Sequence, residues 1–196
     1  NKDYKSWQFK SIDSPYIDPI EVEEARKDSS EEYFRQEYEA SFENYTGLIF
    51  KEFNEWHVKE YIFQRKWNIY LGIDTGKFTA VTFIGLDYDN CAWVFDEIYN
   101  VDGLVEDVVK LIKEKLLKYG LYLNDVQTII DSASQVKREY MAQGLLTIDS
   151  EKDVLNSIDI IRGRLKNKKV VFHKDCITTI SQVRGWEWEP KLSGKK

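Results

Sequence analysis

The chain of 196 residues contains few of the residues that mark disulfide-rich or loop-dominated proteins. Its two cysteines, Cys91 and Cys176, do not make a disulfide framework, so a reducing compartment is expected. The 3 prolines and 10 glycines are too few for a chain built mainly of loops. No apolar run reaches the roughly 18 to 20 residues of a membrane span. A folded protein with no membrane partner is therefore expected.

Aromatic and charged residues are abundant by contrast. Hydrophobic residues make up 42% of the chain and aromatic residues 14%, which is enough apolar area for a sizeable core. The net charge of −6 is atypical of a nucleic-acid-binding protein. Residues 161–196, however, carry 10 Lys or Arg against 3 Asp or Glu, a local balance of +7. This segment could follow a phosphate backbone, unless its charges only complement a helix dipole; its candidates are Arg162, Arg164, Lys166, Lys168 and Lys169.

The first third of the chain, residues 1–66, is expected to be a helical arm. Asp18 and Pro19 have the order of a helix N-cap and first helical residue, and predict a helix through about Lys27. Apolar residues at helical spacing over 30–40 predict a second helix with a serine cap. An irregular, extended connection is expected after it.

Residues 67–196 are expected to form an α/β domain. Three β-rich segments with short, turn-rich connections predict antiparallel strands over 68–74, 79–86 and 91–99. After these strands, the spacing of apolar residues alternates between the helical period and the strand period. This predicts helices over 104–117, 135–143, 153–165 and from 177, and strands over 126–130, 145–148 and 169–173. Right-handed crossovers would place strand 126–130 beside strand 68–74 in a mixed sheet flanked by helices. This is the layout of ribonuclease H-like domains, with another α/β sandwich as the alternative.

Two aspartates stand where predicted strands leave the sheet. Asp74 closes the first strand, and Asp131 closes the strand over 126–130. If these strands are adjacent and parallel, the two carboxylates lie close together at the strand ends. Two negative charges at such a short distance repel each other, which favours a bound cation. Oxygen ligands suit Mg²⁺ or Mn²⁺, and a pair of such ions can serve phosphodiester hydrolysis. The alternative is that each aspartate is only a turn former or a helix cap.

A further acidic pair lies within the third strand. Asp96 and Glu97 are neighbours, so their side chains point to opposite faces of the sheet. Glu97 could then approach the two aspartates as a third carboxylate. The alternative is an exposed charge on a strand near a hairpin.

Several motifs follow one another in a specific order and spacing: Tyr70–Ala80, Val94–Tyr99, Ile129–Ala133, Lys152 ahead of Ser157-Ile158, and Trp186-Glu187-Trp188. Together they resemble the C-terminal nuclease domain of the large terminase subunit of tailed bacteriophages. The arm, through Tyr33–Phe42 and Gly47–Phe50, is similar to the segment that joins the packaging ATPase to the nuclease in these proteins.

The resemblance implies a ribonuclease H-like endonuclease that cuts concatemeric double-stranded DNA with two metal ions, Mg²⁺ or Mn²⁺. Asp74 and Asp131 match its metal-binding aspartates, Glu97 an acidic position of the third strand, and Lys152 a lysine near the scissile phosphate. The family's third metal-binding carboxylate lies in a C-terminal helix, which is expected to follow Lys196. The implied partners are DNA, an ATPase domain of the same parent chain, the small terminase subunit and the portal protein, in the host bacterial cytoplasm.

Two other functions are compatible with the same residues. The run Gly72-Ile73-Asp74-Thr75-Gly76 also resembles the first phosphate loop of actin-like ATPases and sugar kinases, although their duplicated domain needs a longer chain. The sequence contains no Gly-x-x-x-x-Gly-Lys-[Ser/Thr] motif. A non-catalytic module that docks onto DNA or onto the packaging motor is the third possibility.

Overall fold

The computed structural model describes residues 9–40, 47–131 and 134–188, which belong to two compact units. The first unit comprises residues 1–53, 153–167 and 184–196, and the second comprises residues 54–152 and 168–183. This division places the helix over 154–166 with the helix over 19–28, whereas the sequence predicted an arm over residues 1–66 and a domain over residues 67–196.

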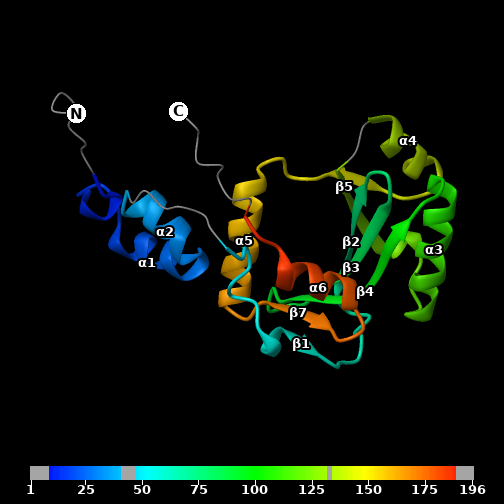
Figure 1. Cartoon of the computed structure of the whole chain (residues 1–196), viewed down its shortest axis with the longest axis horizontal. Helices are drawn as coiled ribbons and strands as arrows, with labels where there is room; N and C mark the ends of the chain where they lie inside the picture. Colours follow the sequence, from blue (N-terminus) through cyan, green and yellow to red (C-terminus); the bar gives the residue numbers. More distant parts are fainter. Residues whose placement is uncertain (1–8, 41–46, 132–133, 189–196) are drawn as a thin grey trace. The chain divides into compact units, whose positions relative to one another are not determined.

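The second unit is built on a seven-stranded mixed sheet of order β1-β7-β4-β3-β2-β5-β6 (Figure 1). Its strands are β1 Val58–Lys59, β2 Asn68–Thr75, β3 Thr79–Leu86, β4 Ala92–Val101, β5 Val126–Asp131, β6 Thr147–Asp149 and β7 Val170–His173. The pairs β2–β3 and β3–β4 are antiparallel, and the remaining pairs are parallel. The predicted fold class and the predicted placement of β5 beside β2 are therefore confirmed. Among the strands of the described residues, only β1 was not anticipated, and it lies within the connection predicted to be irregular.

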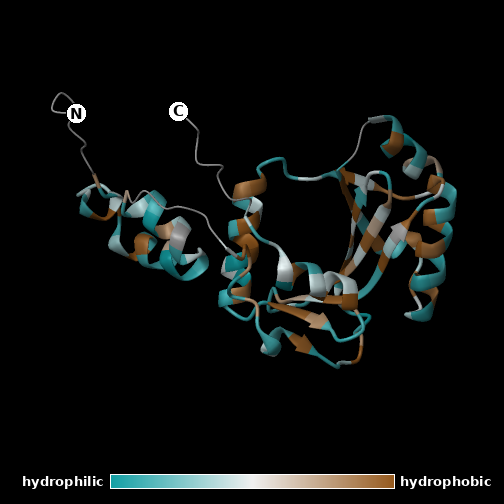
Figure 2. Ribbon diagram, in the orientation of Figure 1, coloured by the Kyte–Doolittle hydropathy of each residue, from teal (hydrophilic) through white to brown (hydrophobic). Residues whose placement is uncertain are grey.

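One face of the sheet carries the core of the second unit. Alternate residues of β2, among them Ile69, Leu71 and Ile73, are buried, as period-two patterning requires. Two helices cover this face, α3 (Val105–Lys118) and α4 (Ser134–Ala142), and bury their apolar stripes against it. Figure 2 shows the corresponding hydrophobic colouring along the strands and along α3. Helix α6 (Ile177–Gly185) follows β7.

The first unit gathers α1 (Pro19–Asp28), α2 (Glu31–Tyr38) and α5 (Val154–Lys166). The predicted caps are confirmed, since the Asp18 side chain accepts from the amide of Ile20 and the Ser30 hydroxyl accepts from the amide of Tyr33. Helix α5 approaches α1 so closely that a Cβ on Gly163 would collide with the Asp28 carbonyl oxygen. Glycine is therefore required at this helix contact.

The remaining structural expectations concern cysteines and membrane spans. Cys91 and Cys176 are both buried, and neither forms a disulfide with a described residue. Among the described residues, no helix has the length and apolarity that crossing a membrane requires.

Candidate functional site

The structure brings the two predicted aspartates together. Asp74 of β2 and Asp131 of β5 are direct partners in the parallel register, on strands that lie about 4.8 Å apart. Their neighbours Ile73 and Ile130 point into the core, so both carboxylates point to the opposite face, and both aspartates are exposed. The hydroxyl of Thr75 donates to the backbone carbonyl of Asp131 at 3.4 Å and ties the two strand ends together.

Lys152 joins this pair from the loop after β6. Its ammonium donates to Oδ1 of Asp131, and the two side chains are 67% and 64% exposed. The hydrogen bond and the charge of Lys152 hold the pKa of the Asp131 carboxyl below its ordinary value, and the same bond raises the pKa of Lys152. A second ion pair joins Lys137 to Asp149, and the charge of Lys137 lowers the pKa of Asp131 further. Sequence spacing gave no sign of this second pair, because helix α4 and strand β6 contribute one member each.

The donor atoms at this place fit a hard divalent cation. Mg²⁺ keeps several waters and takes only one or two carboxylates from a protein, with substrate phosphates completing its shell. Asp74 and Asp131 supply two such carboxylates from rigid strand ends, and the Asp74 carboxylate has no hydrogen bond or ion pair to any described residue. A group of three or more acidic, histidine or cysteine ligands is absent from the described part of the chain.

Glu97 lies on the same face but away from the aspartate pair. Glu97 on β4 pairs with Thr82 on β3, which pairs in turn with Gly72 on β2. Glu97 is therefore two strands away from β2, level with Gly72, which precedes Asp74 by two residues. Strand geometry puts its Cα roughly 12 Å from that of Asp74. The Glu97 carboxylate instead accepts from the amide of Thr178 at 2.9 Å and from the amide and hydroxyl of Thr179 at 2.8 and 2.7 Å. The structure therefore places Glu97 as a partner of the first turn of α6.

These contacts define a pH-dependent role in stability. Burial alone would raise the pKa of Glu97, but the hydrogen bonds from Thr179 and Thr178 outweigh it and hold this pKa below its ordinary value. A carboxyl with a lowered pKa in the folded state adds stability above its unfolded pKa of about 4.3, and this stability is lost as the pH falls through the folded pKa.

We expect Glu97→Gln to lower the free energy of unfolding by about 1–2 kcal/mol at neutral pH, because a neutral amide accepts less strongly from the first turn of a helix. Urea unfolding at pH 7 and in acid measures this. The difference between wild type and variant should shrink in acid, and a constant difference across this range would contradict the assignment.

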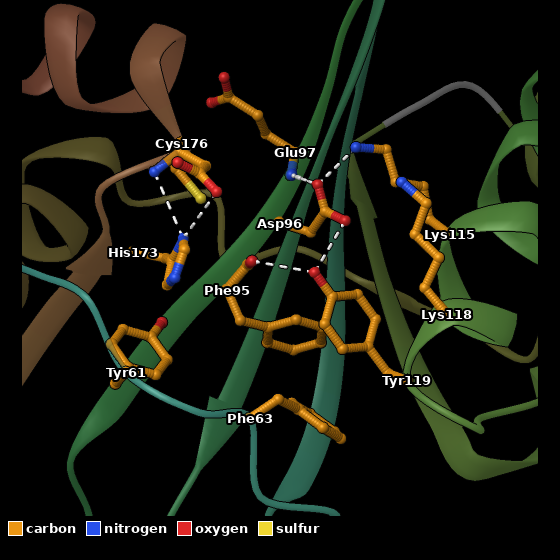
Figure 3. Close-up of a pocket in the computed structure, with 11 residues that line it drawn as sticks. Tyr61, Phe63, Phe95, Asp96, Glu97, Lys115, Lys118, Tyr119, His173 and Cys176 are labelled. Carbon is orange, nitrogen blue, oxygen red and sulfur yellow. Dashed lines mark hydrogen bonds and ion pairs between the residues drawn. The ribbon is translucent and has the colours of Figure 1, made fainter.

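Asp96, the other member of the acidic pair, lines a separate cavity of about 400 Å³ (Figure 3). Its carboxylate accepts from the ammonium of Lys115 at 2.5 Å and from the hydroxyl of Tyr119 at 3.0 Å. Figure 3 shows the Glu97 carboxylate pointing away from this group. The nearby Cys176 thiol is kept protonated, since burial raises its pKa to about 12. Asp96 and Glu97 thus have separate hydrogen-bond partners on opposite faces of the sheet.

The predicted basic segment is divided between the two units, and one of its members is internal. Arg162 is 2% exposed and pairs with both carboxylate oxygens of Glu52, so its side chain lies in the interior of the first unit and not on a surface that DNA could reach. Lys166 donates to the carbonyls of Arg26 and Ser29, at the end of α1.

The other members of the basic segment are at least partly exposed. Arg164 is half-buried. The ammonium of Lys168 lies 5.2 Å from the ring centroid of Trp56, and that of Lys169 donates to the carbonyl of Asp89. DNA contacts by Arg164, Lys166, Lys168 and Lys169 stay predictions.

The sheet, its order and its flanking helices define the second unit as a ribonuclease H-like α/β fold of the kind found in terminase nuclease domains. No family model matches the chain. The chain is 29% identical over 202 residues to the terminase large subunit of Escherichia phage T5, an alignment that covers 94% of this chain and 45% of that protein. The chain thus spans about half the length of this relative.

Solved structures agree with this likeness at the level of fold. A large terminase from a thermophilic bacteriophage superposes with a TM-score of 0.77 at 16% identity, over 90% of this chain and 45% of that one. The nuclease domain of the P22 large terminase superposes with a TM-score of 0.61 at 12% identity, over 74% of this chain and 84% of that one. The predicted resemblance to the nuclease domain of large terminase subunits is confirmed.

Proposed function

We propose that the chain is the nuclease module of a phage packaging terminase, a divalent-metal-dependent endonuclease that cuts concatemeric double-stranded DNA. The observation that carries the proposal is the register of Asp74 and Asp131, two exposed carboxylates on adjacent parallel strand ends. The likeness to the phage T5 terminase large subunit supports this reading over an actin-like ATPase. An ATPase domain in the same parent chain, the small subunit, the portal protein and a location in the host cytoplasm belong to the same proposal.

The chain's own residues would bind and orient the reactants. Asp74 and Asp131 would hold Mg²⁺ or Mn²⁺, and the pairing of β2 with β5 keeps their backbones in place. Bound in pairs, such ions activate water and stabilise the leaving oxygen of a phosphodiester. Lys152 stands beside Asp131 and would meet a phosphate oxygen of the strand that is cut.

Removal of divalent metal tests the proposal. We expect the parent protein that contains this chain to convert supercoiled plasmid into nicked and linear forms with Mn²⁺ or Mg²⁺. Cleavage should stop when EDTA is added, because a phosphodiester is attacked too slowly without the cation. Metal added in excess of EDTA should restore cleavage. Undiminished cleavage in EDTA would contradict the metal requirement, and retained DNA binding without cleavage in any divalent ion would favour a docking module.

A further inference from the structure

The ion pair between Lys152 and Asp131 places a cation of the protein's own on a carboxylate assigned above to a metal ion. We propose that Lys152 is a displaceable counter-ion, which competes with the divalent cation for Asp131 and is released toward the DNA phosphate when that cation binds. This inference rests on the proposed metal site, and adds to it a competition that couples metal binding to phosphate binding.

The contacts around Asp131 give the competition its physical basis. Lys152 donates to one carboxylate oxygen, Oδ1, the type of atom that a hard cation binds. An ammonium and a divalent ion cannot share that oxygen without like-charge repulsion. Asp74, on the neighbouring strand, has no such cation among the described residues. The competition therefore acts at one carboxylate of the pair only.

The exposure of the pair makes the exchange easy. With Lys152 67% and Asp131 64% exposed, the ion pair belongs to the class of surface pairs that water and salt screen strongly and that add little stability. A divalent cation therefore has only a weak competitor to displace. The pair Lys137–Asp149 supplies a separate partner for the adjacent acid, so Asp149 does not replace Asp131 as the principal partner of Lys152.

The released ammonium has a natural new partner. Lys152 is carried by the loop between β6 and α5, beside the strand ends at which the phosphate would be cut. Displacement would free a strongly hydrated positive charge with three donors next to that phosphate. Lys152 thus neutralises part of the negative charge of the metal-free site, and in the metal-loaded site it is free to bind the DNA phosphate.

Mn²⁺ binding to the chain without DNA tests the inference, measured by electron paramagnetic resonance of the free ion. We expect Lys152→Met to bind Mn²⁺ about two- to five-fold more tightly than wild type, because the competing ammonium is gone. Lys152→Arg, which keeps the charge, should stay closer to wild type. Lys174→Met is the matched control. It removes the same charge from an exposed ion pair with Glu60, and the two residues directly follow β7 and β1 at the other edge of the sheet.

The Mn²⁺ affinities of these variants distinguish a failure of the proposed metal site from a failure of the competition by Lys152. Equal or weaker Mn²⁺ binding by Lys152→Met, or the same gain in Lys174→Met, would overturn the competition. Asp131→Asn should weaken Mn²⁺ binding whether or not Lys152 is present. If Asp131→Asn binds Mn²⁺ like wild type, the proposed metal site itself fails, whereas loss in Asp131→Asn with no change in Lys152→Met overturns only the role of the lysine.

Discussion

Replacing either aspartate of the pair by asparagine should reduce Mn²⁺-dependent plasmid cleavage by about a thousand-fold. Asp74→Asn and Asp131→Asn each remove one anionic oxygen ligand while keeping the size of the side chain. Loss of one preorganised contact to the charge that develops in a transition state costs about a hundred- to a thousand-fold in rate, and these variants also weaken the hold on the cation itself. The initial rate of plasmid nicking at saturating Mn²⁺ is the measurement.

Asp89→Asn provides the control for these two variants. Asp89 is an exposed aspartate between β3 and β4, at the end of β3 opposite to Asp74 and Asp131. Its substitution should leave the cleavage rate unchanged, while circular dichroism establishes that all three variants are folded. Cleavage by Asp74→Asn or Asp131→Asn at the wild-type rate would refute the assignment of the metal ligands.

Replacing Arg162 by methionine should lower the free energy of unfolding of the first unit by about 3 kcal/mol. The Arg162 side chain is 2% exposed, and its guanidinium donates to Glu52 through Nε at 3.0 and 3.1 Å and through Nη2 at 2.6 Å. Removing one partner of a buried pair leaves the other charge uncompensated, at a cost of about 3–5 kcal/mol. The lower end applies because Glu52 is 17% exposed. Urea unfolding followed by far-ultraviolet circular dichroism measures the loss.

A double substitution separates the ion pair from simple loss of packing. Arg162→Met with Glu52→Gln should recover at least about 1 kcal/mol relative to Arg162→Met, since the stranded charge is removed as well. Lys27→Met, an exposed cation of the same unit, should change stability by no more than about 0.5 kcal/mol. A loss below about 1 kcal/mol in Arg162→Met would argue against a structural role for this arginine.

The basic residues of this acidic chain differ in how accessible they are to DNA. Arg162 is matched by an internal acid, whereas Lys168 and Lys169 are exposed. The count of +7 over residues 161–196 therefore overstates the charge available to a phosphate backbone. Conversely, Lys152 lies outside this segment and next to the proposed reactive centre.

Local signals in the sequence determined the secondary structure and the placement of the aspartates. Caps such as Asp18 and Ser30 act on amides two or three residues away, and the period of apolar residues depends only on the element that carries them. The pairing of Asp74 with Asp131 followed from the order of strands and helices, because crossover handedness restricts the topologies that such an order allows.

Only the tertiary structure decided which charged side chains meet. Arg162 and Glu52 are 110 positions apart, and Glu97 and Thr178 are 81 apart, so no spacing rule relates them. The same holds for Lys152, in the loop after β6, and Asp131, at the end of β5. Whether a charge faces a core, a helix end or a metal site depends on long-range packing, and this packing assigned Arg162 to the interior, Glu97 to α6 and Lys152 to Asp131.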